Sequence, residues 1–344
     1  MSSKSFGLDI GVTSIKAVSL QRDKNGFLLD ASFIMPAPLK GILSTSPLDE
    51  HEMADALKKV VASAKITTKN VNIALPDNKV YTSVVEMPNL SNKELASALQ
   101  WEAEQYIPLP LADINLVWSI LKRDEKIRVL IVGVQTSVVG KYQKIIEMAG
   151  LNVVSIETEI LSAIRALVYN RDEKLRGHFP HTVIMNIGAE NTSLAIIKDG
   201  LLIFNYSIPI GGSAINRALE ADFGLSQSAS EEYKKVYGIS KEGVGGKIGS
   251  AIEPILVSIL NDVKKALAFY AQKYKDNDAI QQILLCGGTA KLPGIQLFFA
   301  DNLGIETAIS NPWQVLINQD LPKEMLENTS DYTVAVGLAM RGYE

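Results

Sequence analysis

The chain has 344 residues, more than a single hydrophobic core usually supports, so the sequence predicts two or more domains. Apolar residues make up 47% and charged residues 21%, a balance typical of a folded globular protein and not of a disordered one. Lysine and arginine total 34 against 38 acidic residues, and the net charge of −4 argues against nucleic acid as a partner. Cys286 is the only cysteine, which excludes an internal disulfide and indicates a reducing compartment such as the cytoplasm.

The sequence shows no secretion or membrane segment of its own. Met1–Ser5 are mostly polar and lead directly into a strand pattern, without the basic and apolar regions of a signal peptide. No uninterrupted apolar run approaches the roughly 20 residues that a membrane-spanning helix needs. We therefore expect a cytoplasmic protein whose membrane association, if any, is indirect or interfacial.

The first part of the chain predicts a β-meander followed by an α/β unit. Tight turns, one of them at Asn25-Gly26, separate the strand patterns, and apolar residues at helical spacing follow them. The expected strands are Phe6–Ile10, Ile15–Leu20, Phe27–Phe33 and Val71–Leu75, with a helix over residues 49–64.

Residues 80–150 show a different order of expected strands and helices, which predicts an inserted subdomain. After a strand at Tyr81–Glu86, Ser91 and Glu94 have the spacing of a helix-capping box, and the helix should end before Pro108. Trp101 lies off the apolar stripe of this helix, so its ring should contact another surface. Strands at Ile114–Leu121 and Arg128–Gln135 and a helix at Val138–Ala149 are expected to complete the block.

The second half repeats the opening theme. A helix over 157–170 should lead into Arg171–His181, which we interpret as the hinge between halves. Three strands follow, then helices that begin after Gly211-Gly212, a buried strand and a final α/β segment. The expected strands are Val183–Ile187, Thr192–Lys198, Leu201–Ile208 and Ile283–Cys286, with helices over 226–237, 249–274, 293–302 and 331–341.

An internal repeat carries the clearest chemistry. Leu8–Ser14 and Met185–Thr192 share a strand, an Asp or Asn, Ile-Gly and a hydroxyl residue, and the second copy reads as one residue longer. Each copy lies between two strands, unlike a Walker or Rossmann turn, which joins a strand to a helix. Glycine permits close approach, and exposed N–H groups and hydroxyls can bind phosphate. The candidate phosphate-binding residues are Gly11, Val12, Thr13, Ser14, Lys16, Gly188, Ala189, Glu190, Asn191 and Thr192.

A third element follows the buried strand near residue 285. Gly287-Gly288-Thr289 is a small-residue turn that leads toward Leu292 and a helix, where a flat ring can lie against the backbone. Alone, such a turn is more often structural. After two phosphate hairpins, it predicts an adenosine-binding loop.

These three segments, in this order, resemble the signature of the actin-like ATPase superfamily, which includes sugar kinases, heat-shock chaperones and FtsA. The resemblance implies an α/β, actin-like (ribonuclease H-like) two-lobed fold with duplicated halves, an FtsA-type insert, and a cleft for ATP and Mg²⁺. Gly211 and Gly212 resemble the superfamily's turn before the upper subdomain, and Glu231 and Lys234 resemble its ribose contacts, although an ordinary helical ion pair explains them equally well.

The resemblance also implies a division into four parts. The first lobe takes residues 1–79 and 151–177, and the insert takes 80–150. The second lobe takes 178–212 and 278–344, and its upper subdomain takes 213–277.

The insert resembles the FtsA-like PilM family of type IV pilus assembly proteins, chiefly over Trp101–Pro110, and weaker likenesses lie at Ala149–Leu151 and Val336–Arg341. The resemblance implies a cytoplasmic adaptor, peripheral at the inner membrane, that binds the N-terminal peptide of a PilN-like membrane protein in a groove between the insert and the first lobe. Other pilus platform components are also implied partners, and self-association stays open. The expected peptide contacts are Trp101, Gln105, Tyr106, Ile107 and Pro108, although part of this helix can equally be internal core.

The two copies of the repeat differ in one charge. Asp9 is expected to organise Mg²⁺, whereas the second copy has Asn186, which can contact a hydrated metal ion but cannot act as a general base. We therefore expect ATP binding with weak or no hydrolysis, and no catalytic residue is assigned. An FtsA-like filament-forming or cell-division ATPase and an actin-fold small-molecule kinase remain alternatives.

Overall fold

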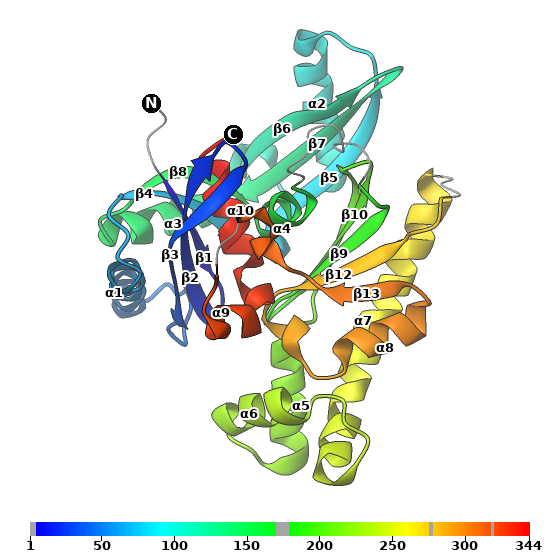
Figure 1. The fold of residues 1–344 in the computed structure, drawn as a ribbon. Coiled ribbons are helices and arrows are strands. Elements are labelled where there is room, and N and C mark those ends of the chain that lie inside the picture. Colours follow the sequence, from blue (N-terminus) through cyan, green and yellow to red (C-terminus); the bar gives the residue numbers. More distant parts are fainter. Residues whose placement is uncertain (1–4, 170–178, 275–277, 318–319) are drawn as a thin grey trace.

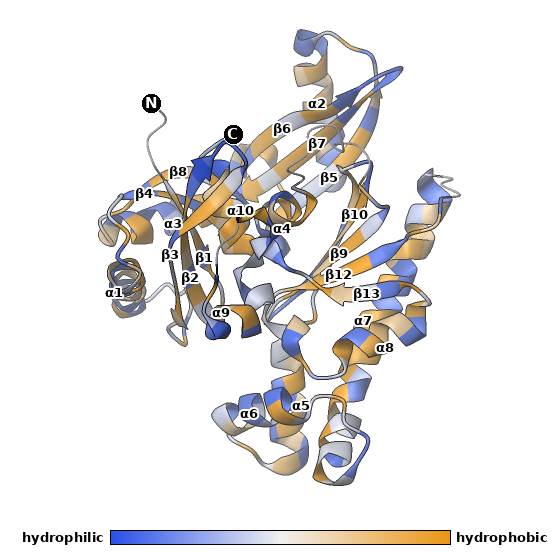
Figure 2. Cartoon of the chain, in the orientation of Figure 1, coloured by the Kyte–Doolittle hydropathy of each residue, from blue (hydrophilic) through white to orange (hydrophobic). Residues whose placement is uncertain are grey.

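The computed structural model describes residues 5–169, 179–274, 278–317 and 320–344. Two five-stranded sheets lie side by side, with helices α4 (Glu159–Val168) and α10 (Thr333–Arg341) between them (Figure 1). Apolar residues concentrate along the strands of both sheets, and hydrophilic residues gather at the turns (Figure 2). Each sheet therefore anchors its own hydrophobic core, which is the two-lobed arrangement that the repeat predicted.

The first sheet has the strand order β3-β2-β1-β4-β8. β1 pairs antiparallel with β2 and parallel with β4, and β4 pairs parallel with β8. The bounds are β1 Phe6–Ile10, β2 Ser14–Asp23, β3 Gly26–Pro36, β4 Asn70–Leu75 and β8 Asn152–Thr158, with α1 at Pro47–Ser63. β8 was not predicted, because only one of its residues is fully buried and its apolar alternation is weak.

The second sheet repeats this topology in the order β11-β10-β9-β12-β13. β9 pairs antiparallel with β10 and parallel with β12, so it occupies the position that β1 has in the first sheet. The bounds are β9 Thr182–Ile187, β10 Thr192–Lys198, β11 Leu201–Ile208, β12 Gln282–Cys286 and β13 Glu306–Ile309, with α8 at Ile295–Leu303. Positive φ angles at Asp199 and Gly200 form the predicted tight turn between β10 and β11.

Helix α10 packs on the first lobe, which corrects the boundary expected at 278–344, whereas the residues around its start keep contacts with the second lobe, such as the hydrogen bond between Ser310 and Thr333. Side chains of α10 share a core cluster with Val18 and Leu20 of β2 and Phe27 of β3. A side chain at Gly7 of β1 would lie 2.3 Å from the carbonyl oxygen of Ala335, so β1 and α10 are in close backbone contact. The chain thus returns to the first lobe before it ends.

The insert contains a three-stranded sheet in the order β5-β7-β6, covered by α2. Its elements are β5 Val80–Pro88, α2 Asn92–Tyr106, β6 Ile114–Arg123 and β7 Lys126–Gln135. Ser91 and Glu94 form the predicted capping box. Helix α3 (Thr136–Met148), which we assigned to the insert, instead packs Tyr142, Ile145 and Ile146 into the first lobe's core, so the insert ends earlier than residue 150.

The upper subdomain is formed by α5 (Gly212–Phe223), α6 (Gln227–Tyr237) and the start of α7 (Gly243–Tyr274), at the bottom of Figure 1. By length and composition alone, α7 is long and apolar enough to cross a membrane, a feature that the search for uninterrupted apolar runs did not find. Its buried side chains recur every three or four residues, from Ile248 to Tyr270, and belong to the second lobe's core cluster. We interpret α7 as a core helix on this packing.

The helix predicted over 157–170 is α4, which begins at Glu159. The hinge expected at Arg171–His181 lies mostly outside the described residues. His181 itself is buried, and its ring lies beside Tyr270 of α7.

Candidate functional site

Two hairpin turns, β1–β2 and β9–β10, lie at equivalent positions in the two sheets and have the same length. Asp9 pairs with Lys16 in the first hairpin, and Asn186 pairs with Ser193 in the second. The N–H of Gly11 donates to the carbonyl of Ser14, and the N–H of Gly188 donates to the carbonyl of Asn191, at 3.0 and 2.9 Å. The extra residue read from the sequence is therefore absent, and Asn191 corresponds to Ser14.

The tips of both turns fit an anionic ligand. Within the described residues, the N–H groups of Val12 and Thr13 donate to no protein acceptor, and the same holds for Ala189 and Glu190. Val12, Thr13 and Glu190 are exposed. Unpaired backbone N–H groups on a glycine-containing turn are the donors that cradle phosphate oxygens.

The first hairpin contains a buried ion pair. The Nζ atom of Lys16 lies 2.9 Å from Oδ2 of Asp9, and both side chains are almost fully buried. Burial by itself would lower the pKa of Lys16, but the charges of Asp9, Asp331 and Glu159 outweigh burial and raise it. Lys16 therefore stays charged at the base of the turn, where it can attract an anion.

The second hairpin is neutral at the matching position. Asn186 is buried, and its amide lies 3.5 Å from Oε2 of Glu159. The hydroxyl of Thr192, expected to contact phosphate, is fully buried and donates to the carbonyl of Ile210 at 2.8 Å. Thr192 thus stabilises the segment that leads into α5. It was expected to contact phosphate because the predicted alignment of the two hairpins was one residue out of register.

Two carboxyl groups that sequence reasoning missed lie beside the second hairpin. Asp77 follows β4 and accepts the N–H of Ile160 at 3.3 Å, and its other oxygen is buried without a partner among the described residues. Burial raises the pKa of Asp77 to about 6. Burial, together with the charges of Asp77 and Asp9, raises the pKa of Glu159 well above its ordinary value. No sequence pattern marks Glu159, which is a single glutamate at the start of a helix. Its carboxyl group lies near both Asp9 and Asn186, where it can influence the chemistry of the site.

Gly211 and Gly212 are expected site residues that pack directly on the second hairpin. The N–H of Gly212 donates to the carbonyl of Gly188 at 2.9 Å. A side chain at Gly211 would come within 2.6 Å of the carbonyl oxygens of Gly188 and Ala189, so only glycine fits. Thr289 joins this cluster, because its hydroxyl donates to Gly188 at 3.1 Å.

The candidate nucleoside contacts also converge near this hairpin. Lys234 lies 2.5 Å from Glu231, and the amide of Asn216, which was not predicted, donates to Glu231 at 2.9 Å. Burial would raise the pKa of Glu231, but Lys234 outweighs it and lowers that pKa, so the carboxylate stays ionised. A side chain added at Gly212 would lie 2.4 Å from Oγ1 of Thr289 and 3.5 Å from Nζ of Lys234.

The glycine turn after β12 behaves as expected, except at its end. Gly287 has φ of +85°, and a side chain there would lie 2.6 Å from Oδ1 of Asn186, so this turn touches the second hairpin. Gly288 is exposed. Leu292 instead is buried in the second lobe's core cluster, which makes it a packing residue.

The described residues contain no group of three or more His, Cys, Asp or Glu side chains that could hold a metal ion. Asp9 and Asn186 therefore do not form a metal site from protein atoms alone. They offer one carboxylate and one amide oxygen, which are ligand types that Mg²⁺ accepts directly or through water.

The insert places the five expected peptide contacts in different surroundings. Trp101 lies on α2 and is 76% exposed, so within this chain its ring does not bury against another surface, and Gln105 and Pro108 are also exposed. Ile107 is buried in the insert's own core, against Gly133, so it stabilises the subdomain. Tyr106 is 42% exposed and lines a cavity between the insert and the second lobe, although the peptide groove was expected beside the first lobe.

Comparison with known proteins identifies relatives over almost the whole chain. A family model described as "Type IV pilus assembly protein PilM" matches residues 7–343. A solved structure described as the "PilM-PilN type IV pilus biogenesis complex" is similar with a TM-score of 0.86 and 26% identity, covering 100% of both chains. Cell division protein FtsA of Streptococcus pneumoniae serotype 2 (strain D39 / NCTC 7466) is 24% identical over 356 residues, which cover 90% of this chain and 76% of FtsA.

A more distant solved structure is MreB 5 of Spiroplasma citri bound to AMPPNP, with a TM-score of 0.52 and 15% identity over 97% of this chain and 94% of MreB 5. These similarities confirm the actin-like two-lobed fold. The family model, which matches residues 7–343, also identifies the family. The chain belongs to the family of the type IV pilus assembly protein PilM.

Proposed function

We propose that this protein is an ATP-binding cytoplasmic adaptor of the type IV pilus inner-membrane platform, which binds the N-terminal cytoplasmic peptide of a PilN-like membrane protein. The observation that carries the nucleotide part is the pair of matched hairpins, each with free N–H groups at its tip and with Lys16 charged at the base of the first. The peptide part rests on the relative solved as a PilM-PilN complex. Membrane contact would then come through partners.

The proposed nucleotide lies between the two hairpins with its phosphates on their tips. Val12, Thr13, Ser14 and Lys16 would contact one side of the phosphates, and Ala189 and Glu190 the other. The ribose would lie near Glu231 and Lys234, and the base would lie against Gly287 and Gly288. Asp9 would organise hydrated Mg²⁺, and the nucleotide's own phosphate oxygens would supply the remaining ligands.

Weak or absent hydrolysis remains part of the proposal. Asn186 carries no charge, so the second hairpin has no carboxylate at the position that Asp9 occupies in the first, and an amide cannot act as a general base. ATP would then act mainly as a ligand that joins the two lobes.

The proposed peptide site is the exposed surface of α2. Trp101 and Gln105 are its central candidates, because both side chains are exposed and belong to the segment that resembles the family. Tryptophan is one of the residue types enriched at binding hot spots.

The test measures fluorescent ATP and PilN-type peptide binding to the native chain and to two glycine variants. Gly211→Val should abolish ATP binding, because the new side chain collides with the second hairpin. Gly140→Ala is the matched control, since nothing lies within 4 Å of a side chain there. Trp101→Ala should weaken the peptide at least tenfold and leave ATP binding unchanged. A native chain that binds neither ligand would refute the proposal.

A further inference from the structure

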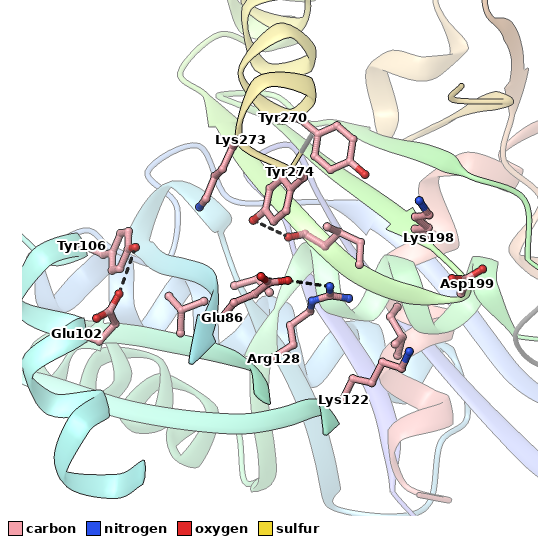
Figure 3. A pocket seen from close by; sticks show the side chains of 14 residues that line it. Glu86, Glu102, Tyr106, Lys122, Arg128, Lys198, Asp199, Tyr270, Lys273 and Tyr274 are labelled. Atoms are coloured by element: carbon pink, nitrogen blue, oxygen red, sulfur yellow. Dashed lines mark hydrogen bonds and ion pairs between the residues drawn. The ribbon is translucent and has the colours of Figure 1, made fainter. Parts of the chain in front are cut away.

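A cavity of about 620 Å³ lies between the insert and the second lobe (Figure 3). Its walls come from β5, α2, β6 and β7 on the insert side, and from β10, β11 and α7 on the other. In Figure 3, Tyr106 and Glu102 lie at one end, Glu86 and Arg128 near the middle, and Lys198 and Asp199 at the other end. The cavity is therefore elongated, and its size is typical of a ligand site.

Two sheet edges flank this cavity. β5 is an edge strand of the insert's sheet, and β11 is an edge strand of the second lobe's sheet. The two strands meet where the amide of Asn205 donates to the carbonyl of Thr82 at 3.0 Å. Further along, residues of both strands line the cavity: Val84, Val85 and Glu86 of β5, and Leu201 and Ile203 of β11. Edge strands carry unpaired N–H and C=O groups that can accept another strand.

The β11 edge is blocked inside the cavity, whereas the β5 edge is not. Ile203 is the extra residue at an irregularity in the β10–β11 ladder. Its carbonyl accepts the hydroxyl of Tyr274 at 3.1 Å. Bulges and capping contacts of this kind protect edges from pairing. Among the described residues, no equivalent contact covers the backbone of Val84–Glu86, which leaves β5 as the strand that can be extended.

Three of the four cationic side chains that line the cavity already have carboxylate partners. Arg128 is paired with Glu86, Lys122 with Asp124 and Lys198 with Asp278. The ammonium of Lys273 lies 5.2 and 5.9 Å from the ring centres of Tyr274 and Phe269, and it has no carboxylate partner within the described residues. A ligand with a negative side chain near Lys273 would complete this end of the cavity.

We propose that the cavity is a docking site for an extended peptide segment that carries an acidic side chain and adds as a strand to the free edge of β5. Backbone hydrogen bonds to β5 would supply affinity, and Lys273 would select the acidic residue. This site is additional to the peptide surface proposed on α2, and it does not depend on ATP binding.

The probes are three fluorescently labelled twelve-residue peptides with the same alternating threonine and valine backbone. The first carries two central glutamates, the second carries two central lysines, and the third is the glutamate peptide with alternate backbone amides N-methylated. Anisotropy with the full chain should show saturable binding of the first peptide and at least tenfold weaker binding of the other two. Equal binding of all three, or binding of none, would overturn the proposal.

A charge reversal tests the position of the site. Lys273→Glu should weaken the glutamate peptide at least fivefold, while Lys58→Glu, an exposed change on α1 in the other lobe, should leave it unchanged. Thermal unfolding checks that both variants fold. The contrary outcome in sedimentation is that Lys273→Glu converts a dimer of this chain to monomers while no peptide binds. In that case a second copy of the chain occupies the cavity, and the proposal fails. ATP and PilN-type peptide binding in the same preparations separate this failure from failure of the proposed function.

Discussion

The two hairpins proposed to bind phosphate have the same backbone hydrogen bonding but different electrostatics. Both place a buried polar residue on the first strand, a four-residue turn, and one internal hydrogen bond between the first and last turn residues. In the first hairpin the buried residue is Asp9, paired with Lys16. In the second it is Asn186, which lies among carboxyl groups with raised pKa values.

The two copies of the repeat therefore match in backbone geometry more closely than in charge. The free N–H groups at both tips depend only on the backbone conformation of the turn. Both hairpins can therefore donate to phosphate oxygens in the same way. Metal organisation needs a carboxylate at the base of the turn, and Asp9 of the first hairpin is matched by the neutral Asn186 in the second. Three changes, ordered by expected effect, test this division.

Asp9→Ala should have the largest effect. It leaves the Lys16 ammonium buried beside more distant carboxylates, and removal of one partner of a buried ion pair costs about 3–5 kcal/mol. We expect a lower midpoint in urea unfolding and at least tenfold weaker Mg²⁺-dependent ATP binding. Asp55→Ala, on the exposed surface of α1, is the matched control. Unchanged ATP affinity in folded Asp9→Ala would remove the proposed metal role.

Protonation of Asp77 should produce a smaller effect that depends on pH. A carboxyl pKa of about 6 in the folded state, against 3.8 ordinarily, means that the folded chain binds this proton more tightly than the unfolded chain. The contribution of Asp77 to stability should therefore fall as pH rises from about 4 to about 6, by at most about 3 kcal/mol. Asp77→Asn should remove this slope in urea unfolding at pH 4, 5, 6 and 7.

Glu50 supplies an internal reference of opposite sign for that measurement. Its hydrogen bonds to Lys141 and Lys144 lower its pKa to about 2, so its contribution is lost as pH falls below about 4.5. The Asp77→Asn variant and the native chain both keep the contribution of Glu50. The difference between their free energies of unfolding therefore isolates the contribution of Asp77. Parallel curves for the two proteins would contradict a raised pKa at Asp77.

Asn186→Asp should have the smallest effect on stability and a specific effect on turnover. The change restores an acid at the second hairpin, next to Glu159, and like-charge repulsion there should cost about 1 kcal/mol. We expect ATP turnover to rise about tenfold and to depend more steeply on Mg²⁺, because each factor of ten needs only about 1.4 kcal/mol of barrier reduction. Asn25→Asp, in the exposed turn between β2 and β3, is the control. Equal turnover in all three proteins would show that the amide does not limit hydrolysis.

Much of this protein followed from local sequence patterns. Short apolar runs bounded by turns predicted β1, β9, β10 and β11 closely, and the capping box at Ser91 and Glu94 predicted the start of α2. The repeat also predicted two related lobes. These features depend on neighbours within a few residues, so periodicity and turn chemistry determine them.

Tertiary structure alone decided what the apolar faces pack against. The stripes of α3 and α10 were visible, but only the folded chain places both on the first lobe. The register of the second hairpin, which buries Thr192, required the pairing of β9 with β10. Glu159 and Asp77 became part of the site only when β4, α4 and β9 met. A sequence specifies which side chains are apolar or charged, whereas burial and proximity, which set their partners and pKa values, arise from contacts between distant segments.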